Sequence, residues 1–391
     1  MKKSMKILHL FSNWKWTGPA EPTVILCETL QRRGHHVTLA YRSPPVEAED
    51  SIAKRILEKC FQGTGRFRLR PLGKSDRGFG LIDTLRDLRS LCRFIDHEGF
   101  DLINVHHSHD HVLGGMAARL SKKRPVVIRT DHKRDAITPS WGNRLLVSRL
   151  TDGIITFSEM ARERNSMKLP IPPERVGRVG LALQLERYDP ERPFRDMRSV
   201  FKINAEDLVV GMVARFQKYR RTEVFLAALA RLVREFSHVK ALLVGRSSQI
   251  RESVIEPTRR LGLDGYVILA GYQTENYLDT LATMDIFVFL MAGSDGTARA
   301  LREAMAMGKP TIVARRGMLH ELVEDGETGF VVDDTPENLL EALRTLVKDE
   351  KLRNYMGRAA RKKALREFQV ERQAQGFEAF YQSILRMGPV A

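Results

Sequence analysis

The hydrophobic positions in the first half of the chain follow two alternating patterns. Short apolar runs rich in β-branched residues are typical of buried strands, and segments with apolar positions three or four residues apart are typical of amphipathic helices. The strand-like runs are residues 6–11, 36–41, 67–72, 101–106, 126–130 and 153–157, and the helical segments include 23–33, 81–97 and 112–120. This repeated alternation predicts a doubly wound parallel sheet.

A polar stretch then separates this half from a second one of the same kind. Residues 183–196 contain two prolines and no periodic apolar pattern, which is typical of an interdomain connection. The alternation restarts with strand-like runs at 208–213, 240–244, 266–269, 285–290, 311–314 and 329–332, with helical segments at 222–235, 253–261 and 277–284. Residues 336–386 are almost purely helical.

The patterns together predict an α/β protein of two doubly wound, Rossmann-like domains that face each other across a cleft. A length of 391 residues is also too great for one typical domain. We place an N-terminal domain at residues 1–182 and a C-terminal domain at 183–369, and we expect the last helix, 370–391, to pack back on the first domain. Clefts at the strand ends of such domains are preferred ligand sites.

The cysteines and the N-terminal residues indicate the cellular compartment in which the protein is expected. The three cysteines, Cys27, Cys60 and Cys92, show no paired spacing, which favours a reducing compartment and argues against a disulfide framework or a zinc knuckle. Residues 1–13 contain lysines and only a short apolar run, so we expect neither a signal peptide nor a membrane span. The protein is therefore expected in the cytoplasm, at most peripherally attached to a membrane.

The formal net charge of +16 implies an acidic partner. Candidates are nucleotide phosphates, an anionic bilayer, an acidic glycolipid and nucleic acid. Nucleic acid is disfavoured because the chain has no basic and aromatic motif of a known reader. The basic residues of the first domain include Arg66, Arg68, Arg70, Lys74, Arg77, Arg86, Arg89, Arg93, Lys122, Lys123 and Arg124. We hypothesise that they adsorb to an anionic inner leaflet or a phosphorylated glycolipid, the alternative being a solvated basic face.

One stretch combines several features of a ligand site. Residues 286–290 read as a buried strand, residues 293–297 as a small polar turn, and residues 298–307 as a helix that stops at Gly308. A strand, a glycine-containing turn and a helix N-terminus together suit a phosphate. Asp295 and Glu303 can both face that site and accept hydrogen bonds from sugar and ribose hydroxyls. In the alternative interpretation Asp295 only caps the helix and Glu303 only pairs with Arg299.

This stretch resembles the nucleotide-sugar-dependent glycosyltransferases of family 4, which are retaining enzymes with the two-domain GT-B fold. The resemblance rests on Asp295-Gly296, Glu303-Ala304-Met305-Ala306 and Gly308-Lys309-Pro310, set against the family pattern of Glu, seven residues, Glu, then Ala-Met-Ala-x-Gly-x-Pro. Residues 34–37, 101–106 and 321–332 resemble further family segments, so the similarity covers nearly the whole chain.

The resemblance implies roles for residues of the second domain. Arg215 and a second cation, either Lys218 or Arg220, would neutralise the donor diphosphate as its charge grows in the transition state. Glu303 would bind the ribose hydroxyls. Further donor-side residues are Tyr272, Asp295, Gly296, Thr297 and Ala298, of which Asp295 and the backbone amides after it would orient the sugar. A solvated basic loop is the alternative interpretation of residues 215–221.

For the first domain the resemblance implies that His106 contacts the transferred sugar. It also implies that Gly18, in the first strand-to-helix turn, lines the acceptor and phosphate side of the cleft and takes part in donor binding. His106, His107, His109, Asp110 and His111 also invite a metal interpretation. Alternation along an extended chain would point these side chains to opposite faces, so we predict no metal site. We expect no cofactor apart from the nucleotide sugar, which is a co-substrate.

Two departures from the family pattern leave alternatives open. Asp295 stands where the family usually has Glu and reaches about 1.5 Å less far. Gly18 stands where two adjacent glycines are common. The main prediction is a metal-independent, retaining transferase for a glycan or glycolipid acceptor, in lipopolysaccharide or other cell-surface polysaccharide biosynthesis. The alternatives are another GT-B enzyme, such as a nucleotide-sugar epimerase or a phosphorylase, and a catalytically weak homologue that binds an anionic glycolipid.

Overall fold

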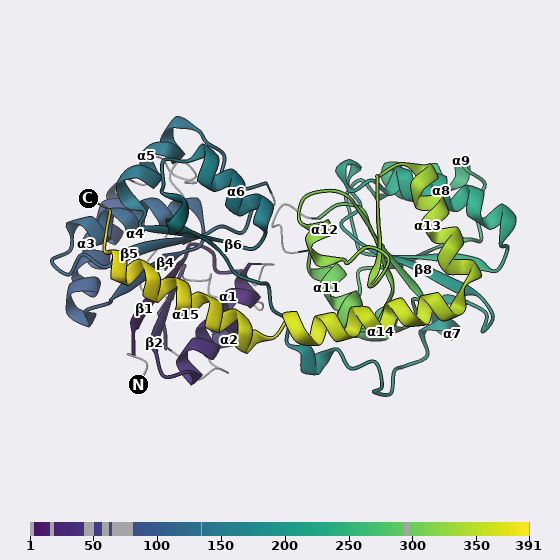
Figure 1. Ribbon diagram of the computed structural model, residues 1–391, viewed down its shortest axis with the longest axis horizontal. Helices are drawn as coiled ribbons and strands as arrows, with labels where there is room; N and C mark the ends of the chain where they lie inside the picture. Colours follow the sequence, from purple (N-terminus) through teal and green to yellow (C-terminus); the bar gives the residue numbers. More distant parts are fainter. Residues whose placement is uncertain are drawn as a thin grey trace. The chain divides into compact units, whose positions relative to one another are not determined.

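The chain forms two compact α/β units (Figure 1). The computed structural model describes residues 4–15, 19–42, 51–56, 62–64, 81–133, 135–292 and 298–390. The first unit consists of the chain up to Ala182 and of the residues from Val370 onward. The second unit comprises Leu183–Gly293 and Ala298–Gln369. Each unit is a parallel sheet with helices on both faces, so the predicted class of two doubly wound, Rossmann-like domains is confirmed.

The sheet of the first unit has the strand order β3-β2-β1-β4-β5-β6-β7, and all its neighbouring strands are parallel. Its strands are β1 (Lys6–Phe11), β2 (His36–Tyr41), β3 (Gln62–Thr64), β4 (Leu102–Val105), β5 (Val126–Thr130), β6 (Gly153–Thr156) and β7 (Val176–Arg178). Its helices are α1 (Ala20–Arg32), α2 (Ile52–Ile56), α3 (Leu81–Glu98), α4 (Ser108–Leu120), α5 (Trp141–Leu150), α6 (Glu159–Lys168) and α15 (Val370–Met387). The winding reverses between β1 and β4.

Alternate residues of the buried strands pack against different helical layers. In β5, Val126 and Ile128 belong to a core that also contains buried residues of α1 and α15, whereas Val127 belongs to a core that contains residues of α3 and α4. This two-sided burial follows from the period of two along a strand and explains why the sequence shows continuous apolar runs.

The C-terminal helix α15 is held on the first unit by buried polar contacts. Glu378 accepts hydrogen bonds from Arg33 Nε and Nη2 at 2.5 and 2.8 Å. Asn104 Nδ2 in β4 donates to the hydroxyl of Tyr381 at 2.7 Å. Figure 1 shows α15 lying across the sheet of this unit. The end of the chain therefore completes the unit in which the chain begins.

The sheet of the second unit has the order β10-β9-β8-β11-β12-β13 and is also parallel throughout. Its strands are β8 (Leu208–Val213), β9 (Val239–Val244), β10 (Val267–Gly271), β11 (Ile286–Phe289), β12 (Thr311–Ala314) and β13 (Gly329–Val332). Its helices are α7 (Met197–Phe201), α8 (Thr222–Glu235), α9 (Glu256–Arg260), α10 (Tyr277–Ala282), α11 (Arg299–Ala306), α12 (Leu319–Leu322), α13 (Pro336–Lys348) and α14 (Glu350–Glu367). The winding reverses between β8 and β11.

Several predicted elements differ from the structure. The expected strand at 67–72 lies outside the described residues, and α5, α6 and β7 have no counterpart in the sequence prediction. Helix α4 begins at Ser108, four residues earlier than expected, so the prediction of an extended chain through His111 was wrong. Helix α11 begins after Ala298, whose φ is +42°, and has no side-chain cap among the described residues.

Candidate active site

The carboxyl ends of β8 and β11 define the expected ligand position in the second unit. These strands are hydrogen-bonded neighbours although they are not consecutive, so the loops that follow them diverge to opposite faces of the sheet. Ligands of open parallel sheets bind outside the carboxyl ends at such a reversal. Arg215 follows β8, and helix α11 with Glu303 follows β11. The two segments that the sequence singled out therefore lead away from the same edge of the sheet.

Three basic residues after β8 occupy different environments. Arg220 ends a 3₁₀ turn (Lys218–Arg220), is buried, and donates from Nη1 to the carbonyl oxygen of Met291 at 2.9 Å. This bond joins the loop after β8 to the chain just beyond β11. Arg215 and Lys218 are exposed, and within the described part of the chain neither side chain has a hydrogen-bond or ion-pair partner. One cation is thus anchored and two remain available for a phosphate.

Glu303 lies inside a cage of hydrogen-bond donors. Its Oε1 accepts from the Tyr188 hydroxyl at 2.7 Å and from Arg299 Nε at 2.6 Å, and its Oε2 accepts from the Tyr277 hydroxyl at 2.5 Å. Only 3% of Glu303 is exposed. A carboxylate offers about four acceptor positions, so this cage leaves room for one further donor. The ion pair between Glu303 and Arg299, which was the alternative interpretation of the sequence, is present. It is one of the three hydrogen-bonded contacts of the Glu303 carboxylate described above.

The two tyrosines of the cage are functional candidates that the sequence did not reveal. Tyr188 is 115 residues from Glu303 and lies in the stretch read as an interdomain connection, where nothing local indicates a contact. Burial, followed by the charge of Glu303, raises the pKa of both Tyr188 and Tyr277 above the ordinary tyrosine value. Both phenols therefore stay protonated and keep donating at neutral pH.

Tyr272 stands at the same edge of the sheet, directly after β10. It is 60% exposed, and the guanidinium of Arg246, which follows β9, lies 4.3 Å from the centre of its ring. Gly245, just before Arg246, has a φ of +142°, and a Cβ there would meet the carbonyl oxygen of Ala214 at 1.9 Å. The chain needs glycine at this position to bring Arg246 to the strand end.

In the first unit His106 follows β4 at the point where that sheet reverses. Its Nε2 lies 3.0 Å from His9 Nδ1 and its Nδ1 lies 3.0 Å from His132 Nε2. All three rings are buried. Burial lowers the pKa of His9 and His132 to about 3, and burial followed by the neighbouring histidines and Arg129 lowers that of His106 well below its usual value. The three imidazoles are therefore neutral and form a hydrogen-bonded row.

The segment after His106 is helical because a capping box starts α4 early. The Asp110 carboxylate accepts from the backbone N–H of His107 at 2.9 Å and from that of Ser12 at 2.8 Å. His107 Nδ1 lies 3.2 Å from the same carboxylate. Asp110 is thus committed to the helix start. Among the described residues no three His, Cys, Asp or Glu side chains are arranged to hold a metal ion.

Several sequence-predicted residues lie outside the described part of the chain. They are Gly18, Asp295, Gly296 and Thr297 of the predicted site, and Arg66, Arg68, Arg70, Lys74 and Arg77 of the basic surface. Ala298 is described and is buried at the start of α11.

Two family models together match most of the chain. The model "Glycosyltransferase Family 4" matches residues 22–187, and "Glycosyl transferases group 1" matches residues 193–363. The chain belongs to the family 4 glycosyltransferases. This glycosyltransferase is 25% identical over 296 residues, 74% of its own length and 76% of the relative's, to N-acetyl-alpha-D-glucosaminyl L-malate synthase from Bacillus anthracis.

Other relatives and solved structures agree with this assignment. The glycosyltransferase is 23% identical over 319 residues, 78% of its length and 81% of the relative's, to the Escherichia coli UDP-Gal:alpha-D-GlcNAc-diphosphoundecaprenol alpha-1,3-galactosyltransferase. Its fold matches that of Anabaena HepE in complex with UDP, with a TM-score of 0.80 and 20% identity over 97% of this chain and 100% of that one. HepE has also been solved in complex with UDP-glucose. The architecture is therefore that of the GT-B enzymes.

Proposed function

We propose that this glycosyltransferase moves a sugar, with retention of anomeric configuration and without a metal ion, from a nucleotide sugar to a glycan or glycolipid acceptor. The observation that carries the donor proposal is the strand-end site of the second unit, where exposed Arg215 and Lys218 stand at the same sheet edge as the helix of Glu303. These two cations would balance the negative charge of the leaving diphosphate. In other glycosyltransferases a metal ion has this role. UDP is the first nucleotide to test, because HepE binds it.

Each site residue receives a role in this proposal. Arg215 and Lys218 bind the diphosphate, while Arg220 fixes their loop through its bond to Met291. Glu303 takes a ribose hydroxyl in its remaining acceptor position. Tyr272 lies on the nucleobase side, and Asp295 with the amides of Gly296, Thr297 and Ala298 orients the sugar. The second domain is the donor domain.

The acceptor approaches from the first domain, past Gly18 and His106. The bond between the anomeric carbon and the phosphate oxygen breaks while the acceptor oxygen bonds to that carbon on the same face. The leaving phosphate oxygen takes the acceptor proton. The row of His9, His106 and His132 in the first domain is neutral, so no imidazolium takes part in this proposal.

The acceptor that we propose belongs to lipopolysaccharide or another bacterial cell-surface polysaccharide. The Escherichia coli relative acts on a GlcNAc-diphosphoundecaprenol, which is a lipid-linked glycan. An enzyme with a lipid-linked acceptor would work at the inner face of the cytoplasmic membrane, and we propose this location. Within the described residues no helix combines the length and the apolar character needed to cross a bilayer.

Thermal-shift measurements with UDP-, GDP- and ADP-sugars test the donor proposal. We expect one nucleotide class to raise the unfolding midpoint by several degrees and to be consumed when a lipid-linked acceptor is added. Addition of EDTA should leave the transfer rate unchanged. The donor proposal fails if no nucleotide sugar stabilises the protein, and consumption of the donor without acceptor would instead favour an epimerase or a phosphorylase.

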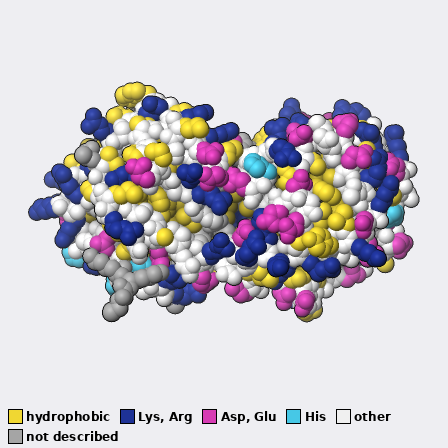
Figure 2. Space-filling model, viewed as in Figure 1, with side chains coloured by type: hydrophobic (Ala, Val, Ile, Leu, Met, Phe, Trp, Pro, Cys, Tyr) yellow, Lys and Arg dark blue, Asp and Glu magenta, His cyan; other side chains and the backbone are white. Residues whose placement is uncertain are grey.

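A groove between α3 and α4 is the surface that we assign to the membrane. Leu85 and Leu120 line it and are 58% and 66% exposed, and Arg86 and Arg89 stand beside them. Leucines that enter the lipid headgroup region next to cations complement an anionic leaflet. On the face shown in Figure 2, by contrast, Lys and Arg side chains are scattered among acidic ones.

Replacing Arg89 with glutamate should weaken co-sedimentation with phosphatidylglycerol vesicles by about tenfold, since each basic residue near such a surface contributes about 1 kcal/mol. Arg164→Glu makes the same charge change at an exposed position of α6 and should have a much smaller effect. Equal binding to neutral and anionic vesicles would contradict the membrane assignment.

A further inference from the structure

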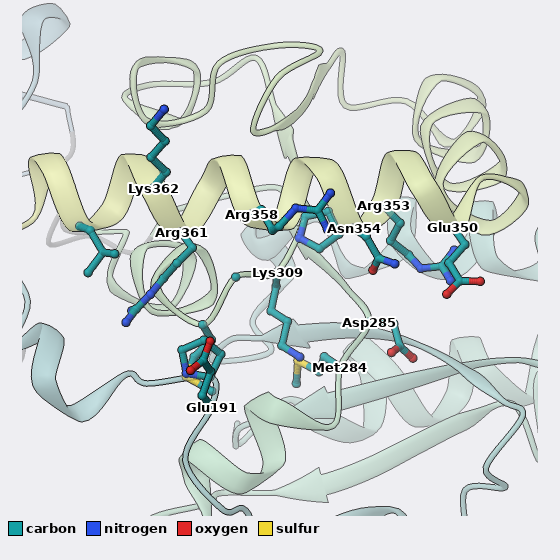
Figure 3. A pocket seen from close by; sticks show the side chains of 15 residues that line it. Glu191, Met284, Asp285, Lys309, Glu350, Arg353, Asn354, Arg358, Arg361 and Lys362 are labelled. Atoms are coloured by element: carbon teal, nitrogen blue, oxygen red, sulfur yellow. The ribbon is translucent and has the colours of Figure 1, made fainter.

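A second groove lies in the second unit, at the edge of the sheet opposite the donor site. It has a volume of about 710 Å³ and runs between α14 and the residues that precede β11 and β12 (Figure 3). Met284 and Asp285 precede β11, and Lys309 and Pro310 precede β12. Because Arg215 follows the carboxyl end of β8, the groove is separated from it by the length of the strands.

Basic side chains dominate the charged groups of this groove. Five of them line it: Lys309, Arg353, Arg358, Arg361 and Lys362. Three carboxylates also line it, and one of these, Asp285, already accepts from Arg198 Nη2 at 3.0 Å and from the backbone N–H of Val209 at 2.8 Å. Glu191 and Glu350 are the other two. Asp189 and Glu191 act on Arg361, and Glu324 and Glu327 line an adjoining hollow together with Arg358 and Lys362, so carboxylates offset the five cations only in part.

Three of the cations are held in place by backbone carbonyl groups. Lys309 Nζ donates to Ala282 at 2.7 Å and Arg353 Nη1 donates to the carbonyl of Leu346 at 2.7 Å. Arg361 Nη1 donates to the carbonyls of Tyr188 and Ala306, both at 2.5 Å. These bonds fix the side chains but do not neutralise them, since a carbonyl group carries no net charge.

The five cations have no ion-pair partner in the described part of the chain, and Arg358 and Lys362 have no side-chain hydrogen bond there either. In Figure 3 Lys309 and Arg361 lie on the side of α14 that faces the strand ends, whereas Lys362 points away from it. Burial lowers the pKa of Lys309 to about 8 and also lowers that of Arg361. An anion in the groove would favour the charged form of both groups.

We propose that this groove binds the phosphate group of a small organic molecule. Fixed, unpaired guanidinium and ammonium groups match the several acceptor oxygens of a phosphate. Leu365 in the same lining is 41% exposed and provides apolar surface for the organic part. The site is distinct from the donor site, so the inference stands independently of the proposed transfer reaction.

Isothermal titration of the full chain with glycerol 3-phosphate tests the proposal. UDP is present at saturation so that the strand-end cations are already covered. We expect binding to the wild type that is weakened at least tenfold in Arg358→Glu. Arg358 is exposed and makes no contact that this change would break in the described structure, so the variant should fold. Lys351→Gln, exposed on the same helix but outside the groove, should bind as the wild type does.

A second arm separates a soluble phosphate from a lipid headgroup. Arg358→Glu and the wild type are compared for binding to phosphatidylglycerol vesicles. If Arg358→Glu weakens the binding of glycerol 3-phosphate, the ligand is a soluble phosphate. If Arg358→Glu weakens only the binding to vesicles, the phosphate is carried by a lipid. The proposal is overturned if the wild type binds neither probe, or if Arg358→Glu binds both as well as the wild type does.

Discussion

Replacing Arg215 with alanine is expected to lower kcat by about a hundredfold to a thousandfold, which is the usual effect of removing one group that stabilises charge developing in a transition state. Arg215 follows β8 at the sheet reversal, is exposed, and has no side-chain partner in the described chain. Its loss should therefore leave the free energy of unfolding nearly unchanged. The measurement is the steady-state rate of sugar transfer at saturating donor.

A matched control distinguishes this role from a general effect of charge. Arg234→Ala removes an exposed arginine of the same unit, on α8, and should leave kcat within about twofold of the wild type. Arg215→Lys keeps the charge and should recover part of the rate. If Arg215→Ala transfers sugar as fast as Arg234→Ala does, Arg215 has no place at the diphosphate.

The wild type is expected to bind UDP at least tenfold more tightly than 2′,3′-dideoxy-UDP. The reason is the acceptor position left open on Glu303, since a hydrogen bond to a charged group contributes about 1.5–3 kcal/mol. Glu303→Gln keeps the shape of the side chain but removes its charge, so it should lower this ratio markedly. Calorimetric titration with the two nucleotides gives the ratio directly.

The same ratio tests whether the tyrosine cage positions Glu303. Tyr188→Phe removes one donor from Oε1 and lets the carboxylate turn, so the preference for UDP should fall several-fold while the affinity for dideoxy-UDP changes little. Tyr355→Phe, at an exposed tyrosine of α14, is the control. A wild type that binds both nucleotides equally would refute the ribose role of Glu303. A ratio that is normal in Tyr188→Phe would refute only the positioning role.

The main elements of the fold could be predicted because their signals are local. Buried parallel strands such as β11 show as continuous apolar runs, and α8 was placed at its observed bounds from helical periodicity alone. The signals failed where a local pattern was weak or misread. Helix α6 carries few apolar residues. The start of α4 depends on a capping box between His107 and Asp110, in a segment for which the sequence pattern predicts extended chain.

The candidate site was predicted only in part. The sequence supplied Arg215, Lys218, Arg220 and Glu303 through their resemblance to a family pattern, but it left undecided which cations were available. The structure separates them, because Arg220 is buried against the carbonyl of Met291 while Arg215 and Lys218 are exposed. This difference depends on the pairing of β8 with β11, which are far apart in the chain.

By itself the sequence determined that strands and helices alternate in two successive domains, that the class is parallel α/β, and which family the chain resembles. Each of these depends only on the order and spacing of neighbouring residues. Only the tertiary structure decided what Glu303 touches, how His106 is paired, and where five cations outnumber the carboxylates of one groove around Arg361. The bonds from Tyr188 to Glu303, between His9 and His106, and from Arg361 to Ala306 join residues more than fifty positions apart. They exist only once the strand order has been set by burial of both faces of each sheet.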